Sequence, residues 1–219
     1  MNDAVIINPP QPANASVIWL HGLGADGHDF ESIITHFSPT VTKHTRFIFP
    51  HAPLREITIN MGMRMRGWYD VAAMNLTKQQ DEKGIRESER LIHTFIQTEL
   101  QANITSQRII LAGFSQGGAI ALHTGLRYPQ SLGGIMALST YLPLADTLIT
   151  EKQAENDNIA IFMGHGLHDP VIGVAQGQKS KEHLESLGYH VEWHEYTMEH
   201  HINMAEIADI GQWLTTRLG

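Results

Sequence analysis

Short apolar runs alternate with polar and amphipathic stretches along most of the chain. The runs have the length and composition of buried strands and lie at positions 16–20, 45–49, 108–112, 134–139, 159–163 and 190–196. The stretches between them predict helices at positions 28–37, 83–103, 118–122 and 174–187, with a last one carrying Ile207, Ile210, Leu214 and Leu218 on one face. Buried strands separated by helices predict an α/β fold with a mainly parallel central sheet and helices on both faces.

The pentapeptide Gly113-Phe114-Ser115-Gln116-Gly117 lies between a predicted strand and a predicted helix, with a serine at its centre. This pattern is typical of a nucleophile elbow, a sharp turn that holds a serine hydroxyl out from the sheet. Glycine two residues to either side lets the strand and the helix approach closely. We therefore predict that Ser115 is a nucleophile; the alternative is an ordinary turn.

A serine hydroxyl needs a base, and the base needs an acid that orients it. Asp169 follows the predicted strand at 159–163, and His200 follows the one at 190–196. Catalytic groups of open α/β sheets gather at the carboxyl ends of the strands, so we expect these side chains together. Their chain order of Ser, Asp and His is that of α/β-hydrolases. The sequence predicts a catalytic triad of Ser115, Asp169 and His200.

A glycine-rich loop at 21–27 follows the first predicted strand, and its three glycines satisfy the dinucleotide-binding spacing G-x-G-x-x-G. That motif also needs an acidic residue near the end of the next strand, and positions 45–53 contain none. We favour an oxyanion hole, in which the backbone N–H groups of Leu23 and Gln116 bind developing negative charge.

The segment from 57 to 71 is rich in methionine and aromatic residues and shows no helical period. Methionine fills cores as well as binding surfaces, and both interpretations stay open here. As a substrate-binding hypothesis, we expect Met63, Met65 and Trp68 to line an apolar groove for an acyl chain, together with Leu23 from the glycine loop.

Composition limits the function further. A chain of 219 residues is long enough for one sizeable core, so we expect a single domain over 1–219. No apolar run approaches the ~20 residues of a membrane span, so we expect no stable membrane insertion.

The net charge of −8 argues against nucleic acid or an anionic membrane as the main partner. The first ten residues lack a basic segment and contain two prolines, so we expect no signal peptide and a cytoplasmic location.

Cysteine and histidine narrow the chemistry of the site. The chain has no cysteine, so a thiol nucleophile is excluded. Among its 14 histidines, His190 with His194 and His200 with His201 form pairs that invite a metal-site interpretation. No third carboxylate or histidine is spaced to complete either site, so we expect no metal.

Together these motifs resemble the small serine carboxylesterases, a family that includes the acyl-protein thioesterases and the bacterial phospholipase/carboxylesterase group. The resemblance covers nearly the whole chain and rests on positions 19–24, 50–53, 58–70, 113–117, 138–143 and 164–171. It departs at the base, where the family commonly has Met-Gly-His and this chain has Met198-Glu199-His200-His201. Composition does not choose between His200 and His201, but the register of the neighbouring residues against the family pattern implies that the base is His200.

The resemblance implies an α/β-hydrolase without a separate lid domain, often a homodimer, that uses no cofactor. It implies hydrolysis of carboxyl esters or acyl thioesters with short to medium acyl chains, through an acyl-enzyme on Ser115. Asp169 and His200 match the family triad, and Leu23 and Gln116 match its oxyanion hole. The acyl donor stays open among small esters, lysophospholipids and S-acylated proteins.

Two other functions compete with this one. A non-catalytic binding protein would keep the pocket without turnover, and the intact triad argues against it. A peptidase is disfavoured because this length leaves little room for the additional domains that many α/β-hydrolase peptidases use to enclose a chain.

Overall fold

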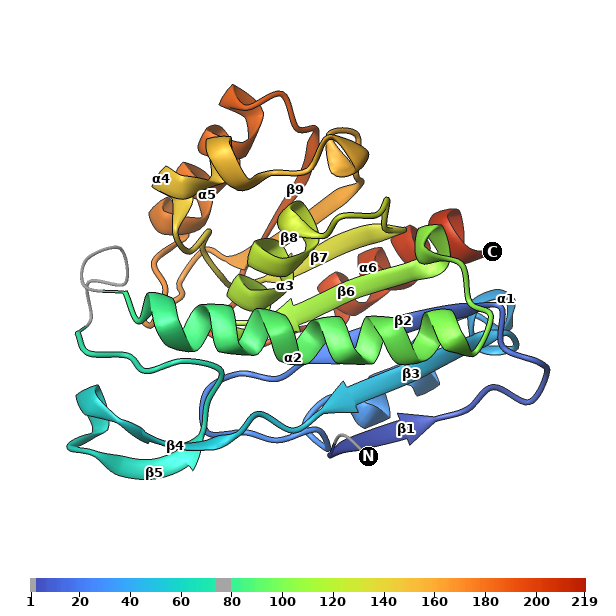
Figure 1. Cartoon of the computed structure of the whole chain (residues 1–219), viewed down its shortest axis with the longest axis horizontal. Coiled ribbons are helices and arrows are strands. Elements are labelled where there is room, and N and C mark those ends of the chain that lie inside the picture. The colour runs from blue at the N-terminus through green and yellow to red at the C-terminus, as the bar shows by residue number, and fades with distance from the viewer. Residues whose placement is uncertain (1–2, 74–79) are drawn as a thin grey trace.

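A seven-stranded sheet forms the centre of the computed structural model, which describes residues 3–73 and 80–219 (Figure 1). Its strands follow the order β1-β3-β2-β6-β7-β8-β9. Their bounds are Ala4–Ile7 (β1), Ala15–Leu20 (β2), Thr45–Pro50 (β3), Ile109–Phe114 (β6), Gly134–Leu138 (β7), Ile161–Gly166 (β8) and Val191–Tyr196 (β9). β1 pairs antiparallel with β3, and the other neighbours pair parallel. The predicted mainly parallel sheet is confirmed.

Helices cover both faces of this sheet, as predicted. One face packs against α2 (Glu82–Gln101), α3 (Gln116–Arg127), α4 (Ala145–Glu151) and α5 (Val174–Ser186). The other packs against α1 (Pro39–Thr42), α6 (Met204–Leu218) and the 3-10 helix η1 (Glu31–His36). Figure 1 shows α2 in front of the sheet and α6 behind it. Short 3-10 turns lie at Ser106–Arg108 (η3) and Ala154–Asn156 (η4). Across the described ranges, no helix is long and apolar enough to cross a bilayer.

Alternation along the strands divides the buried side chains between two cores. In β2, Ile18 and Leu20 belong to the core under α2 and α3, whereas Val17 and Trp19 belong to the core under α6. Successive side chains of a strand point to opposite faces, so a strand covered on both sides must be apolar throughout. All six residues of β2 are buried, which explains its continuous apolar run.

Four segments differ from the sequence predictions, and two of them are the short helices α1 and α4, which were not predicted. The edge strand β1 was not predicted, because its four residues are mostly half-buried and form too short a run to stand out. The segment expected to be helical over 28–37 forms only the six-residue 3-10 helix η1.

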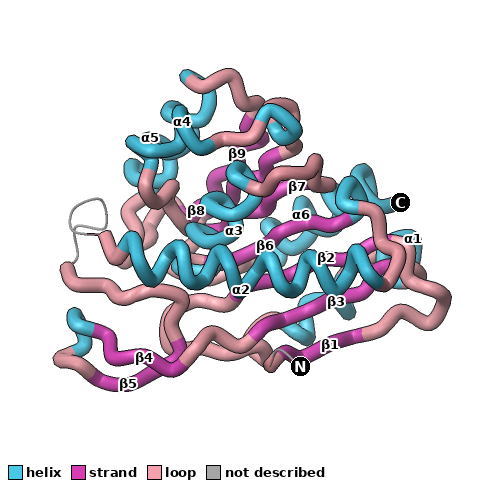
Figure 2. The backbone as a smooth tube through the Cα atoms, in the orientation of Figure 1, coloured by secondary structure: helices cyan, strands magenta, loops and turns pink. Residues whose placement is uncertain are grey.

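The methionine-rich segment forms a hairpin outside the main sheet. Strands β4 (Leu54–Ile57) and β5 (Met63–Arg66) pair antiparallel and are joined by the 3-10 turn η2 (Thr58–Asn60). Figure 2 shows the hairpin projecting beyond the ends of the central strands. The expectation of a strand or extended loop here agrees with this hairpin.

One carboxyl group is buried between α6 and the sheet without a partner. Glu206 is wholly inaccessible to solvent, and neither of its carboxyl oxygens has a hydrogen-bond partner in the described chain. It fits because residue 164 of β8 is glycine, where a Cβ would lie only 2.1 Å from Glu206 Oε1. Burial, with a smaller contribution from Asp209, raises the pKa of Glu206 to about 8.

We predict that Glu206 makes the protein less stable as pH rises. The unfolded chain loses this proton near the ordinary pKa of 4.5, whereas the folded chain keeps it up to about pH 8. Between these values the free energy of unfolding falls, by on the order of 3 kcal/mol from pH 5 to pH 8. Urea unfolding across this range should show that fall, and Glu206→Gln, which cannot ionise, should show less of it by about this amount. Identical slopes for the two proteins would contradict the assignment.

Candidate active site

Ser115 occupies a strained turn between β6 and α3. Its backbone has φ 54° and ψ −120°, a region that a residue with a side chain enters only at a cost in free energy. A Cβ on Gly113 would lie 2.3 Å from the carbonyl carbon of Gly117, and a Cβ on Gly117 would lie 2.3 Å from the carbonyl oxygen of Leu20. Glycine is therefore required on both sides of the serine.

His200 connects Ser115 to Asp169. Its Nε2 lies 2.9 Å from Ser115 Oγ, and its Nδ1 lies 2.7 Å from Asp169 Oδ2. Ser115 follows β6, Asp169 follows β8 and His200 follows β9, so parallel pairing brings their loops to the same edge of the sheet. The structure thus assembles the three residues that the sequence assigned to a triad.

The turn after β8 fixes the Asp169 carboxylate. Its Oδ1 accepts the backbone N–H groups of Val171 and Ile172 at 2.8 and 2.9 Å. Burial by itself would raise the pKa of Asp169, but the hydrogen bonds from His200 and from these amides outweigh it and hold the pKa below its ordinary value. Asp169 is therefore an anion that orients the His200 ring and can stabilise its imidazolium form.

His165 supports the same turn from the end of β8. The ring is fully buried, and its Nε2 lies 2.8 Å from the carbonyl oxygen of Ile172 and 3.6 Å from Asp169 Oδ2. A carbonyl can only accept, so Nε2 carries the hydrogen. Burial lowers the pKa of His165, which keeps the ring neutral. No pattern in the sequence predicts a role for His165. Its position four residues before Asp169 is the one feature that could have pointed to such a role.

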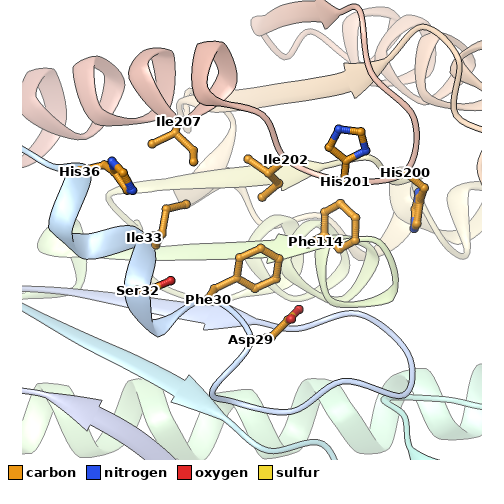
Figure 3. Close-up of a pocket in the computed structure, with 10 residues that line it drawn as sticks. All are labelled: Asp29, Phe30, Ser32, Ile33, His36, Phe114, His200, His201, Ile202 and Ile207. Carbon is orange, nitrogen blue, oxygen red and sulfur yellow. The ribbon is translucent and has the colours of Figure 1, made fainter.

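The loop after β9 separates the two adjacent histidines. A Cβ on Gly166 would lie 2.4 Å from the carbonyl oxygen of Glu199, so this loop packs directly on the end of β8. The His200 ring lies 4.8 Å from the Phe114 ring, centroid to centroid. Figure 3 shows the His200 and His201 rings pointing in different directions, and His201 is exposed. Of these two histidines, His200 is the one hydrogen-bonded to the Ser115 hydroxyl among the described residues.

Leu23 and Gln116 each offer a backbone N–H at the elbow. Gln116 is the first residue of α3, so its N–H has no acceptor within the helix. Across the described residues, the N–H of Leu23 also lacks a protein acceptor. The glycine loop lies against the elbow, since a Cβ on Gly22 would be 3.6 Å from Ser115 Cβ. The structure thus brings both predicted oxyanion residues to the nucleophile.

Hydrogen bonds join the elbow to the end of the hairpin. The side-chain Oε1 of Gln116 accepts the N–H of Trp68, and its Nε2 donates to the carbonyl of Tyr69, both at 2.7 Å. From the glycine loop, the N–H of Gly24 donates to the carbonyl of Arg66 at 2.8 Å. Gln116 therefore holds the wall of the site with its side chain as well as offering its backbone N–H.

His21 fixes the start of the glycine loop. Its Nε2 accepts the N–H of Ala52 at 3.0 Å, so its Nδ1 carries the hydrogen and donates to the carbonyl of Gly22 at 2.7 Å. Burial lowers the pKa of His21 to about 4. The ring is therefore neutral at physiological pH and holds the loop without placing a charge beside it.

A cavity of about 230 Å³ opens directly beside the nucleophile. Apolar side chains and two tyrosines form most of its wall, which consists of Leu23, Ile59, Asn60, Tyr69, Val71, Ser115, Gln116, Tyr141, Val171 and Ile172. Among these, sequence reasoning named only Leu23, Ser115 and Gln116. Four of the others, Ile59, Asn60, Tyr69 and Val71, come from the 57–71 segment for which a substrate-lining role was left open, although they are not the residues expected to line the groove.

Three residues expected in the acyl groove do not line this cavity. Met63 is 61% exposed on the hairpin, and the Met65 sulfur accepts a hydrogen bond from the Asn60 amide. Trp68 is fully buried, and its indole N–H donates to the carbonyl of His21 at 2.9 Å. Met63 and Met65 lie on β5 and Trp68 follows it, and none of the three is part of the cavity wall.

A second cavity, of about 340 Å³, is lined in part by His200 (Figure 3). It is lined by Asp29, Phe30, Ser32, Ile33, His36, Phe114, His200, His201, Ile202 and Ile207. The Phe30 and Phe114 rings lie 5.7 Å apart in its wall. Burial, followed by the nearby Asp26 carboxylate, raises the pKa of Asp29. His200 thus lines this second cavity and contacts Ser115, which lines the first.

The structure also bears on the alternative sites. Within residues 3–73 and 80–219, no group of three or more His, Asp or Glu side chains is arranged to hold a metal ion. The glycine loop that matched a dinucleotide motif packs against Ser115. A dinucleotide motif would be followed by a long helix, whereas this loop is followed by the short 3-10 helix η1. A serine hydroxyl, an imidazole, a carboxylate and two N–H groups without an acceptor in the described chain are the kinds of group that acyl transfer needs.

Comparisons with known proteins agree with this arrangement. The chain is 37% identical to acyl-protein thioesterase 1 of Gibberella zeae over 213 residues, which cover 93% of this chain and 91% of that protein. Among solved structures it resembles SOBER1 of Arabidopsis thaliana, with a TM-score of 0.89 and 31% identity over 94% of this chain and all of that one. Acyl-protein thioesterase 2 of Zea mays matches with a TM-score of 0.88 and 27% identity over the full length of both chains.

These similarities confirm the α/β-hydrolase fold and the family resemblance seen in the sequence. The family model described as phospholipase/carboxylesterase matches residues 1–218, nearly the whole chain. The chain therefore belongs to the phospholipase/carboxylesterase family.

Proposed function

We propose that this protein is a serine hydrolase that cleaves carboxyl esters and acyl thioesters through an acyl-enzyme on Ser115. The observation that carries the proposal is the continuous chain of contacts from Ser115 Oγ through His200 to the Asp169 carboxylate, at 2.9 and 2.7 Å. Membership of the phospholipase/carboxylesterase family supports it independently.

The proposed reaction has two halves. In the first, His200 Nε2 removes the proton from Ser115 Oγ as the oxygen attacks the substrate carbonyl carbon, and the N–H groups of Leu23 and Gln116 bind the resulting oxyanion. The bond between the carbonyl carbon and the leaving oxygen or sulfur then breaks. As it breaks, the imidazolium gives its proton to that atom, and the alcohol or thiol departs. In the second half, His200 activates a water that attacks the acyl-enzyme, and Ser115 leaves with the proton restored.

We place the acyl chain in the cavity beside Ser115. Its wall includes Leu23, Ile59, Val71 and Ile172, which provide apolar surface for a short to medium chain. The leaving group then lies on the His200 side, because His200 must reach the departing oxygen or sulfur with its Nε2. This assignment replaces Met63, Met65 and Trp68 as groove residues.

The name of the Gibberella zeae relative suggests S-acylated proteins as one substrate class for this chain. The same chemistry serves small esters and lysophospholipids, which differ in the leaving group and leave the triad's role unchanged.

We further propose that the protein is cytoplasmic and forms a homodimer. The exposed Leu54, Met61 and Met63 of the hairpin support a protein contact there, and light scattering and cell fractionation test the two proposals.

Ser115→Ala should abolish turnover. Without the nucleophile oxygen no acyl-enzyme forms, and removing one member of a triad costs several orders of magnitude, about 10⁴-fold or more in kcat. Hydrolysis of p-nitrophenyl butyrate measures the loss, and an unchanged thermal unfolding midpoint shows that the variant folds. A fluorophosphonate probe should label the wild type and not the variant. Retained turnover by Ser115→Ala would refute the mechanism, and failure to label the wild type would favour the non-catalytic alternative.

The two adjacent histidines should behave differently. His200→Ala removes the contact with Ser115 and should lower kcat by several orders of magnitude. His201→Ala is the matched control: its side chain is exposed and makes no contact with Ser115 in the described structure, so the variant should keep most of its activity. The reverse pattern would place the base on His201.

Val71→Phe should shorten the acyl chains that the enzyme accepts. The larger ring fills part of the cavity, so kcat/KM for p-nitrophenyl octanoate should fall about tenfold or more relative to the acetate, as expected when a pocket loses room for one or two methylene groups. Met63→Ala, on the exposed hairpin, should leave the chain-length profile unchanged. A shifted profile in Met63→Ala together with an unshifted one in Val71→Phe would return the groove to the hairpin.

A further inference from the structure

Two tyrosine hydroxyls meet in the wall of the cavity beside Ser115. Tyr69 lies just after the hairpin and Tyr141 lies just after β7, and each is 3% exposed. Both residues line the cavity, and their hydroxyl oxygens lie 2.8 Å apart. The mechanism proposed above uses neither hydroxyl.

The backbones of both tyrosines are anchored to the elbow. The carbonyl of Tyr69 accepts from the Gln116 side chain at 2.7 Å. The residue before Tyr141, Thr140, donates its hydroxyl to the carbonyl of Ser115 at 2.7 Å. The two hydroxyls are therefore held in a fixed position relative to the nucleophile.

The two hydroxyl groups carry two hydrogens, and the hydrogen bond between them uses only one. Each phenol has one O–H donor, and the single contact between them uses one donor and one acceptor. In the described chain no other group is hydrogen-bonded to either hydroxyl. One buried O–H donor is thus left over, and a buried polar hydrogen without a partner costs free energy.

Neither hydroxyl can escape this cost by ionising at physiological pH. Burial raises the pKa of Tyr141 to about 12 and, with the neighbouring Tyr141 as a further cause, raises the pKa of Tyr69 well above its ordinary value. Besides the tyrosines, Ser115 and Gln116, the cavity wall has one more uncharged polar side chain, Asn60. It is only half-buried and donates one amide hydrogen to the Met65 sulfur. An amide carries a second hydrogen and a carbonyl oxygen, so Asn60 can also meet a chain, but the spare tyrosine donor is the more deeply buried of the two.

We propose that the Tyr69–Tyr141 pair selects acyl chains that carry a neutral oxygen acceptor, such as a hydroxyl or ether oxygen, at the carbon that reaches the pair. The inference rests on the proposed function, since it assumes that the acyl part of an ester occupies this cavity. An oxygen in the chain accepts the spare hydrogen, and a hydroxyl on the chain can in addition donate to a tyrosine oxygen. A carboxylate is disfavoured because the surrounding wall is mostly apolar and offers no cation.

The test uses p-nitrophenyl octanoate and analogues in which one methylene, from carbon 3 to carbon 7, is replaced by an ether oxygen. The replacement keeps the length of the chain and adds only an acceptor. Each kcat/KM is divided by the rate of spontaneous hydrolysis of the same ester, which corrects for intrinsic reactivity. In the wild type, one position or two adjacent positions should exceed the remaining oxygen positions by about tenfold, the worth of one hydrogen bond.

The variant Tyr69→Phe/Tyr141→Phe is the decisive one, because it removes both hydroxyls and keeps both rings. Replacing both partners of a buried hydrogen bond by apolar groups is nearly neutral for stability, so this variant should fold. It should lose the positional preference while still hydrolysing octanoate. Each single variant leaves one hydroxyl with its hydrogen free, so at least one of them should keep the preference and both should unfold more easily than the double variant.

The outcomes separate this proposal from the proposed function. A flat oxygen profile in the wild type, or the same peak in the wild type and the double variant, would overturn the selection by the tyrosine pair while octanoate turnover left the esterase intact. Absence of octanoate turnover in the wild type, together with absence of turnover of every shorter ester and thioester, would instead overturn the esterase function itself.

Discussion

The backbone of Ser115 is the constraint on which the rest of the site depends. A non-glycine residue at φ 54° is unfavourable, and it persists here because the surrounding packing leaves no alternative. Gly113 and Gly117 allow β6, α3 and the end of β2 to approach within distances that a Cβ would forbid. The three elements are central in the fold, so the strain is supported by both hydrophobic cores. A serine placed this way projects its hydroxyl from the edge of the sheet at a fixed point, and the remaining groups are arranged around that point.

Fixed hydrogen bonds with neutral donors hold those groups in place. His21 and His165 are buried, their pKa values are lowered by burial, and each donates to a backbone carbonyl in a loop of the site. Gln116 holds the wall formed by Trp68 and Tyr69. Asp169 carries the negative charge of the triad and is hydrogen-bonded to His200. Preorganised dipoles of this kind can stabilise charge that develops during a reaction without having to reorient first.

Much of this site could be predicted from the sequence because its signals are local. The glycines around Ser115 report a backbone conformation, and Asp169 and His200 follow apolar runs that had to be parallel strands. Leu23 and Gln116 are identified by backbone position, which does not depend on where their side chains point. The groove prediction failed for Met63, Met65 and Trp68 because an alternating apolar segment has two faces, and nothing local says which face meets the cavity. In the folded chain Trp68 is in the core and Met63 is in solvent.

By itself, the sequence determined the alternation of the main strands and helices, the elbow and the chemistry of the three aligned side chains, since these follow from short-range patterns of apolar residues and glycine. Only the tertiary structure decided which residues from distant loops share a wall. Tyr69 and Tyr141 are separated by 72 positions, yet their hydroxyls lie 2.8 Å apart. Glu206 is on α6, and its carboxyl group can be buried because residue 164, in another element, is a glycine. Such pairings depend on how whole elements pack, and packing is a property of the complete set of contacts that no single segment contains.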